Sequence, residues 1–143
     1  VEVETIPGPT AFVPALVNSG LPCERFTFEG FLPPKKGRAS RLAELATEPR
    51  TMIIYESPLR LVRTLGDLCE TFGEDRQASV SREISKLHDT THRGSLGQLL
   101  DYFKVNNPRG ECVIVVSGFK SERTEQKVHR NKFKKDVDAP EPI

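Results

Sequence analysis

Thr51-Met52-Ile53-Ile54-Tyr55-Glu56-Ser57-Pro58 is the stretch that decides the fold. Its first five residues are uncharged and mostly apolar, and they lie between Pro49 and Pro58, a pattern typical of a strand buried on both faces. Ser57 followed by Pro58 is typical of a helix start, because serine caps helices and proline is favoured in the first turn. The stretch therefore predicts a central strand that leads through a polar turn into a helix.

The flanking sequence extends this pattern in both directions. Apolar residues recur at helical spacing from Leu61 to Phe72, and Gly73 ends the run. The other patterns predict helices over 11–19, with Thr10 as the cap, over 38–47 and from Ser95 onward, and strands over 25–32, 78–84, 88–93 and 112–116. Strands that alternate with helices favour an α/β fold, a mixed sheet with flanking helices.

Composition excludes several classes of protein. The 143 residues hold 21 Lys and Arg against 20 Asp and Glu, so a wholly basic nucleic-acid binder is excluded, although a local basic patch is not. No apolar run approaches the roughly 20 residues of a membrane span. The three cysteines are widely spaced and form neither a disulfide framework nor a zinc pattern, which fits a reducing cytoplasm. Glycine-rich phosphate loops and a Gly-x-Ser-x-Gly motif are also missing from the sequence.

Polar residues follow two of the predicted strands. Glu56 ends the first, and Arg82-Glu83-Ile84-Ser85-Lys86 ends another. One interpretation is a ligand-binding edge, because α/β folds bind ligands where strands end. The alternatives are a helix start with Glu56 near its positive end, and a surface cluster of ion pairs at 82–86.

Two further clusters have open interpretations. Lys35, Lys36 and Arg38 follow Pro33-Pro34 in a predicted exposed loop, which either grips a phosphate backbone or is merely solvated. His88 and His92 share a strand face but lack further metal ligands, so a plain histidine pair is favoured over a metal site. Residues 120–143 form a basic tail without a core pattern.

Several segments together are more specific than any one of them. They are Ile6-Pro7-Gly8-Pro9-Thr10-Ala11, Ser19-Gly20-Leu21-Pro22, Phe28-Glu29-Gly30-Phe31-Leu32-Pro33, Tyr55-Glu56-Ser57-Pro58, Phe72-Gly73-Glu74-Asp75-Arg76, Arg82-Glu83-Ile84-Ser85-Lys86 and Gly110-Glu111. In this order and spacing, over about residues 3–118, they resemble the ribosomal RNA small subunit methyltransferase I family of the tetrapyrrole methylase superfamily.

The resemblance implies the C-terminal domain of a two-domain tetrapyrrole methylase fold, with S-adenosylmethionine (SAM) bound between the domains. Residues 1–10 would be the inter-domain hinge, 11–119 the C-terminal methylase domain and 120–143 a tail, and the N-terminal domain would be absent from this chain. The implied cofactor-binding residues are Pro9, Thr10, Ala11, Glu56, Arg82, Glu83, Ile84, Gly110 and Glu111, with much of the contact made by backbone groups.

The resemblance also implies an activity, the transfer of a methyl group from SAM to the ribose 2′-hydroxyl of a cytidine in small-subunit ribosomal RNA, without a metal. Lys86 and Glu83 are the candidate catalytic bases, because the hydroxyl is a weak nucleophile, although either could instead position RNA or cofactor. Lys35, Lys36 and Arg38 are the candidate RNA-binding residues. This chain alone is expected to be inactive, since half a cleft binds SAM poorly.

Two alternatives stay open at this stage. One is a precorrin-type tetrapyrrole methyltransferase domain, and the other is a non-catalytic module for dimerisation or RNA docking. A homodimer is expected, because an apolar surface without its covering domain favours self-association.

Overall fold

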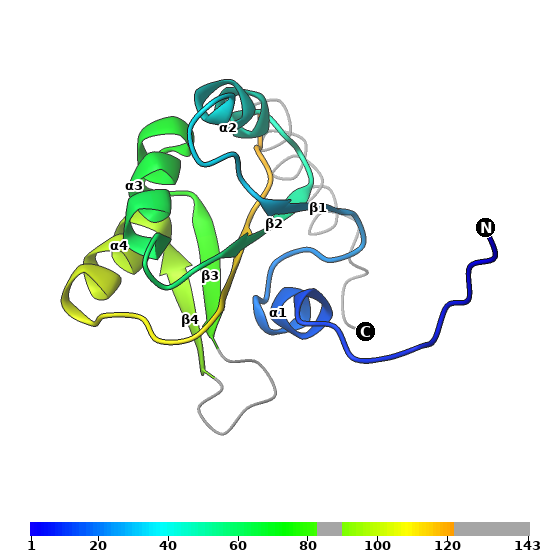
Figure 1. The fold of residues 1–143 in the computed structure, drawn as a ribbon. Coiled ribbons are helices and arrows are strands. Elements are labelled where there is room, and N and C mark those ends of the chain that lie inside the picture. Colours follow the sequence, from blue (N-terminus) through cyan, green and yellow to red (C-terminus); the bar gives the residue numbers. More distant parts are fainter. Residues whose placement is uncertain (83–89, 122–143) are drawn as a thin grey trace, which may run out of the picture.

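In a computed structural model of the chain, residues 1–82 and 90–121 are described. Within these ranges the elements in chain order are α1 (Phe12–Asn18), β1 (Phe26–Phe31), α2 (Arg38–Ala46), β2 (Thr51–Glu56), α3 (Leu61–Phe72), β3 (Gln77–Arg82), β4 (Thr90–Ser95), α4 (Leu96–Val105) and β5 (Cys112–Val116). Figure 1 shows the strands as one twisted sheet between helices. The predicted α/β class is confirmed.

The five described strands form a mixed sheet in the order β1-β2-β5-β3-β4. β1 pairs with β2 in parallel, whereas β5 is antiparallel to both of its neighbours and β4 is antiparallel to β3. As a result β1, β2 and β3 run in the same direction, and their carboxyl ends lie at one edge of the sheet. The structure thus places at a common edge the strand ends that are far apart in the sequence.

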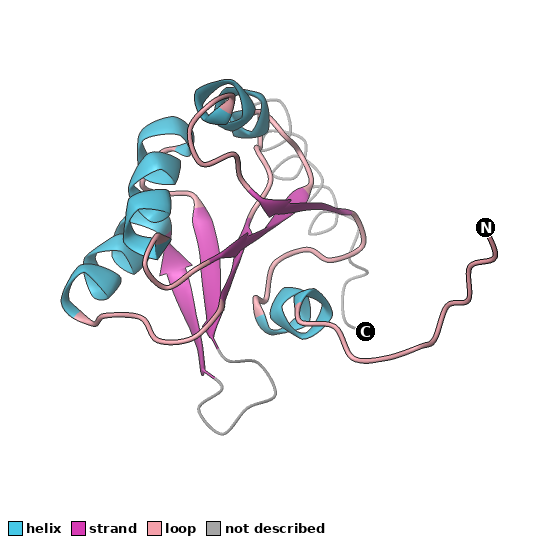
Figure 2. Ribbon diagram, viewed as in Figure 1, coloured by secondary structure: helices cyan, strands magenta, loops and turns pink. Residues whose placement is uncertain are grey.

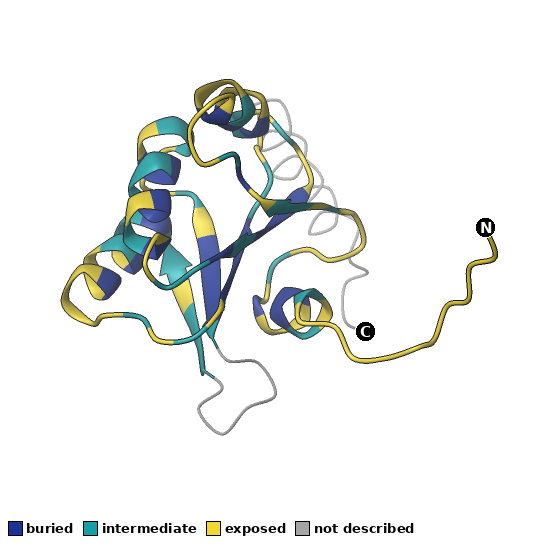
Figure 3. Cartoon of the chain, in the orientation of Figure 1, coloured by how far each residue is buried: buried dark blue, intermediate teal, exposed yellow. Residues whose placement is uncertain are grey.

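The two faces of the sheet are covered unequally (Figure 2). Helices α2, α3 and α4 cover one face and bury the larger core cluster, which includes Met52, Ile54, Val80 and Ile114. The short helix α1 lies on the other face, where Ala15 and Leu16 pack against a smaller cluster around Ile53, Val113 and Val115. Figure 3 shows the buried faces turned inward and the exposed leading segment that precedes α1. Both faces of β2 and β5 are therefore covered, as their apolar runs predict.

Several boundaries match the sequence prediction, and two helix caps do not. Ser95 caps α4 as predicted, and Gln98 completes a capping box with it. In contrast α3 begins at Leu61 rather than near Ser57, because residues 57–60 first form a turn in which Arg60 N–H donates to the Ser57 carbonyl at 3.1 Å. Thr10 does not cap α1, whose N-cap is Ala11 without a side-chain hydrogen bond.

Aromatic side chains on the α1 side of the sheet form an exposed cluster. The Phe28 ring lies 5.2 Å from both Phe12 and Tyr55, and Phe31 lies 5.9 Å from Tyr55. Phe28 and Phe31 remain 51% and 63% exposed, which agrees with the apolar surface expected from the sequence. The homodimer inferred from such a surface stays a prediction. In the described ranges, no helix combines the length and apolar character that a membrane span requires.

Candidate functional site

Residues from four strands form one row at the carboxyl ends of β2 and β3. Glu56 pairs with Cys112, Cys112 pairs with Arg82, and Arg82 pairs with Thr90. Gly110 and Glu111 precede β5 and therefore lie just beyond this row. The structure thus brings together four of the predicted cofactor-binding residues at the edge where α/β folds bind ligands (Glu56, Arg82, Gly110 and Glu111).

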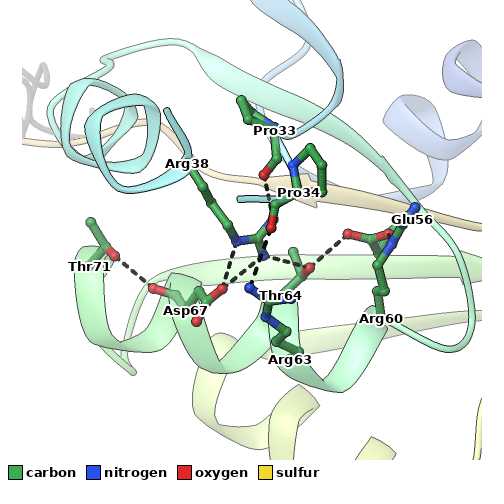
Figure 4. Close-up of polar contacts among 9 residues, drawn as sticks. All are labelled: Pro33, Pro34, Arg38, Glu56, Arg60, Arg63, Thr64, Asp67 and Thr71. Atoms are coloured by element: carbon green, nitrogen blue, oxygen red, sulfur yellow. Dashed lines mark hydrogen bonds and ion pairs between the residues drawn. The ribbon is translucent and has the colours of Figure 1, made fainter. Parts of the chain in front are cut away.

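The Glu56 side chain is buried, and both of its carboxylate oxygens accept hydrogen bonds within the chain. Its Oε1 accepts hydrogen bonds from Ser57 N–H at 2.8 Å and from Arg60 Nε at 3.0 Å. Its Oε2 accepts from Thr64 Oγ1 at 2.7 Å (Figure 4). A buried carboxylate requires such donors, because burying an unpaired charge is costly. The side chain therefore holds the 57–60 turn in place.

Arg38 continues the same network, and this corrects the prediction that it lies in the exposed loop. Its side chain is buried at the start of α2, where Nε donates to Asp67 at 2.9 Å and Nη2 donates to Thr64 Oγ1 at 3.0 Å. Nη1 donates to the Pro33 carbonyl at 3.2 Å. The guanidinium has five donors that must find acceptors when buried, and Asp67 neutralises its charge. Arg38 is consequently committed inside the chain rather than free to meet a phosphate.

Lys35 and Lys36 are exposed, as the sequence predicts. Their loop follows the carboxyl end of β1, so it lies on the same side of the sheet as the row of strand ends. Arg63 is also exposed in the first turn of α3, and its Nη2 donates to the Pro34 carbonyl at 3.4 Å. This contact connects the loop to α3 and places a third cation beside the two lysines.

The middle of the row has no nucleophilic character. Burial raises the pKa of the Cys112 thiol to about 11, the Arg82 charge opposes this shift, and the Glu56 carboxylate adds to it. The thiol is therefore protonated at neutral pH and contacts the Gly110 carbonyl at 3.5 Å. Gly110 has a φ of 73°, a left-handed conformation that favours glycine before β5.

Arg82 extends from the row toward the end of α4. Its Nε donates to Thr90 Oγ1 at 3.2 Å, and its Nη1 donates to the Arg109 carbonyl at 3.5 Å. A pocket of about 420 Å³ opens here, lined by Arg82, Tyr102, Phe103, Asn106, Asn107 and Arg109. The sequence analysis did not identify this pocket, because residues 106–109 contain no motif and only folding brings them to Arg82.

His92 lies beside this pocket. Its ring is 4.4 Å from Tyr102 and 5.4 Å from Phe103. Burial, and then the Arg82 charge, lower the pKa of His92, so the imidazole is neutral at pH 7. Among residues 1–82 and 90–121 no three His, Cys, Asp or Glu side chains gather as metal ligands do. His88 lies outside the described residues, so the histidine pair favoured by the sequence stays a prediction.

The remaining predicted residues are not placed in this row. Pro9, Thr10 and Ala11 are exposed and lead into α1, which packs on the face of the sheet opposite to α2, α3 and α4. Glu83, Ile84 and Lys86 lie outside the described residues, so their predicted roles stay predictions.

Thr64 and Asp67 are the residues of this site that the sequence analysis missed. Thr64 lies on the buried stripe of α3 between Leu61, Leu65 and Leu68. A hydroxyl on an otherwise apolar stripe needs a buried partner, and this signal could have identified it. Asp67 lies one turn later on the same helix and offered no such signal.

The sequence matches a known family over most of its length. The family model described as "Tetrapyrrole (Corrin/Porphyrin) Methylases" matches residues 1–100. A Synechocystis relative named "Ribosomal RNA small subunit methyltransferase I" is 46% identical over 119 residues, which are 82% of this chain and 43% of the relative. A Pseudomonas aeruginosa protein of the same name is 43% identical over 131 residues, covering 90% of this chain and 46% of that protein. The chain thus spans about half the length of these relatives.

Solved structures share the fold at low sequence identity. A cobalt precorrin-4 methyltransferase superimposes with a TM-score of 0.64 at 16% identity, over 82% of this chain and 52% of its own. The uroporphyrin-III C-methyl transferase of Thermus thermophilus, solved in complex with S-adenyl homocysteine, gives 0.53 at 21% identity, over 80% and 52%. These likenesses establish the fold alone.

Replacing Thr64 with valine tests the network around Glu56. Thr64→Val keeps the shape of the side chain but removes the donor to Glu56 and the acceptor for Arg38, so we expect a loss of about 1–3 kcal/mol in the free energy of unfolding. Thr71→Val is the matched control in the same helix, because the Thr71 hydroxyl bonds only to the Asp67 carbonyl at 2.7 Å. Its effect should stay within about 0.5 kcal/mol. Urea unfolding measures both values, and equal losses would contradict the network's importance.

Proposed function

The chain belongs to the tetrapyrrole methylase family, and we propose that it is the C-terminal half of a SAM-dependent methyltransferase that acts on small-subunit ribosomal RNA. The observation that carries this proposal is the similarity to proteins named "Ribosomal RNA small subunit methyltransferase I", which are 42% to 48% identical over most of this chain. The structural neighbours that are named for cobalt precorrin-4 or uroporphyrin-III are only 16% to 21% identical, which favours RNA over a tetrapyrrole as substrate.

The row of strand ends is suited to one side of a SAM site. The ladder between β2 and β5 stops at Glu56 and Cys112, so the peptide groups of Gly110 and Glu111 lie beyond it. Backbone groups of this kind can bind the adenine and the amino-acid part of the cofactor. Glu111 is exposed and offers a carboxylate to the cofactor's positive charge. Pro9, Thr10 and Ala11 would complete the hinge side, together with Arg82, Glu83 and Ile84 at the next strand end.

The chemistry requires positioning and a base. SAM supplies a methyl group that is already activated by its sulfonium, so the chain's main task is to hold the RNA in line with it. The 2′-hydroxyl would lose its proton to a nearby base as its oxygen takes the methyl group, and the sulfonium would leave as a neutral thioether when its bond to the methyl carbon breaks. Glu83 and Lys86 are our candidates for this base. The ribose of a cytidine is the proposed acceptor.

Cations surround the proposed site. We define the basic rim as the six cationic side chains on the carboxyl-end side of the sheet: Lys35, Lys36, Arg60, Arg63, Arg82 and Arg109. Arg60 pairs with Glu56 at 3.0 Å, and its side chain still stays 50% exposed. A chain with a net charge of only +1 therefore concentrates positive charge at one edge, where it would attract RNA phosphates.

Methyl transfer is the experiment that tests the proposal. The chain, joined to the N-terminal region that precedes it in its relatives, is incubated with tritiated SAM and small ribosomal subunits that lack the modification. We expect label in the ribosomal RNA at one ribose, detected as a backbone linkage resistant to alkali. This chain alone should transfer no label. Label found only in a tetrapyrrole, or in no substrate at all, would contradict the proposal.

The two exposed lysines of the basic rim should contribute to RNA binding through phosphates. In Lys35→Ala/Lys36→Ala, we expect the slope of log affinity against log salt for the small subunit to decrease by about 1–2 in magnitude. Arg25→Ala/Lys120→Ala is the matched control, because it removes the same charge from a pocket at the opposite end of the strands. An unchanged slope for the lysine pair, or the same change in the control, would exclude a direct phosphate contact.

A further inference from the structure

We propose that the pocket between Arg82 and the end of α4 is a second RNA-binding site, which takes one backbone phosphate and the nucleotide attached to it. We call it the α4 pocket; its lining is Arg82, Tyr102, Phe103, Asn106, Asn107 and Arg109. The choice of RNA as the ligand rests on the proposed function, whereas the anion-binding character rests on the pocket itself.

The α4 pocket adjoins the row of strand ends and shares Arg82 with it. Arg82 lies in that row, and Arg109 directly precedes the Gly110-Glu111 segment. Phe103 is buried in the core between the sheet and α4, so the pocket lies on the face of the sheet that α4 covers. Helix α1 lies on the other face, and the leading segment extends away from the sheet beyond it (Figure 1). A ligand in the α4 pocket would therefore occupy different space from a cofactor held between this chain and a domain that precedes the hinge.

The charge in the α4 pocket favours an anion. Among the residues that the structure describes, its lining contains two guanidinium groups and two amides but no carboxylate. Within residues 1–82 and 90–121 neither Arg82 nor Arg109 forms a salt bridge, and the described partners of Arg82 are the neutral oxygens of Thr90 and of the Arg109 backbone. The bond to the Arg109 carbonyl also holds the 106–110 segment against β3. Arg82 is held by these two hydrogen bonds and the Arg109 side chain is exposed beside it, so the two guanidinium groups can donate together to a phosphate.

An aromatic ring lies next to these two cations. Tyr102 is stacked on His92 at 4.4 Å and meets the edge of Phe103 at 5.0 Å, yet it keeps 41% of its surface exposed. The Tyr102 ring is thus held in place by His92 and Phe103 while part of it stays exposed to solvent, as a stacking platform for a base requires. His92 is neutral at pH 7, so the stack adds no charge of its own.

The polar groups and the size fit a nucleotide better than a bare ion. Asn106 Nδ2 donates to the Tyr102 carbonyl at 3.0 Å, which leaves its Oδ1 and the whole amide of Asn107 for a ribose or a base edge. The volume of about 420 Å³ lies within the range of small-ligand pockets. Lys35 and Lys36 stand at the other end of the basic rim. An RNA strand that contacts both ends would pass across the row of strand ends, where methyl transfer is proposed.

The binding of a labelled single-stranded RNA to the 143-residue chain tests this site by fluorescence anisotropy at several salt concentrations. We expect Arg109→Gln to weaken binding about fivefold to tenfold and to reduce the salt slope by about 1. The backbone carbonyl that Arg82 binds is unchanged in this variant. Lys104→Gln is the matched control, because Lys104 is exposed in the last turn of α4 and does not line the α4 pocket. Its effect should be less than twofold.

A second pair of variants separates stacking from charge. We expect Tyr102→Leu to weaken binding severalfold without changing the salt slope, and Tyr102→Phe to keep the affinity, because the ring alone does the stacking. Equal effects of Arg109→Gln and Lys104→Gln would overturn the site. A second result would also overturn the site: adenosine monophosphate binds in a way that depends on Arg109, whereas RNA binding does not depend on it. That result would assign the pocket to a free nucleotide.

The methyl-transfer experiment keeps this inference apart from the proposed function. If the extended protein methylates RNA and Arg109→Gln leaves RNA binding unchanged, the α4 pocket is not an RNA site and the proposed function stands. If RNA binding depends on Arg109 but no methyl group is transferred to RNA, the α4 pocket is an RNA site and the proposed function is contradicted.

Discussion

The buried carboxylate of Glu56 is the constraint on which the rest of the site depends. It lies at the end of the central strand, with only 5% of its surface exposed, and it must be fully hydrogen-bonded there. Its donors come from the next residue and from the start of α3, and the Thr64 donor is in turn held by Arg38 of α2. One charge thus connects the strand end, the 57–60 turn and two helices.

This connection divides the charges at the strand-end side of the sheet into two groups. The first group is Glu56, Arg38 and Asp67 (Figure 4). Glu56 accepts hydrogen bonds from Arg60 and Thr64, and Arg38 pairs with Asp67 and also donates to Thr64. The basic rim stays at the surface, and only Arg60 belongs to both groups. The backbone at this edge, which would contact a cofactor, is therefore held in place by the network around Glu56. The basic rim around it carries positive charge where a polyanion would approach. The loops that follow β1, β2 and β3 lie at this edge, and the described helices cover the two faces of the sheet.

The sequence predicted the parts of the fold that depend on local patterns. The apolar runs of β2 and β5 and the capping serine of α4 are signals within a few residues, and the structure confirms them. The helix start at Ser57 was wrong because the Glu56 carboxylate takes the Ser57 N–H, a contact that no capping rule contains. Arg38 was misplaced for a similar reason, since its partners Thr64 and Asp67 lie 26 and 29 residues away.

The order of the strands also depends on distant contacts. β5 inserts between β2 and β3 although it follows both in the chain, and this insertion is what brings Gly110 and Glu111 next to Glu56 and Arg82. A one-dimensional pattern does not specify such pairing. The family resemblance supplied the grouping of these residues before the structure did. The catalytic base, the homodimer and the cytoplasmic location stay predictions.

The measurement that tests the central claim most directly is SAM binding by isothermal titration calorimetry. It compares this chain with the chain joined to the N-terminal region of its relatives. If the strand ends form one side of a shared cleft, the extended protein binds SAM and the 143-residue chain binds it far more weakly or not at all. Equal affinity of the two proteins, or no binding by either, would contradict a cofactor site shared between two domains.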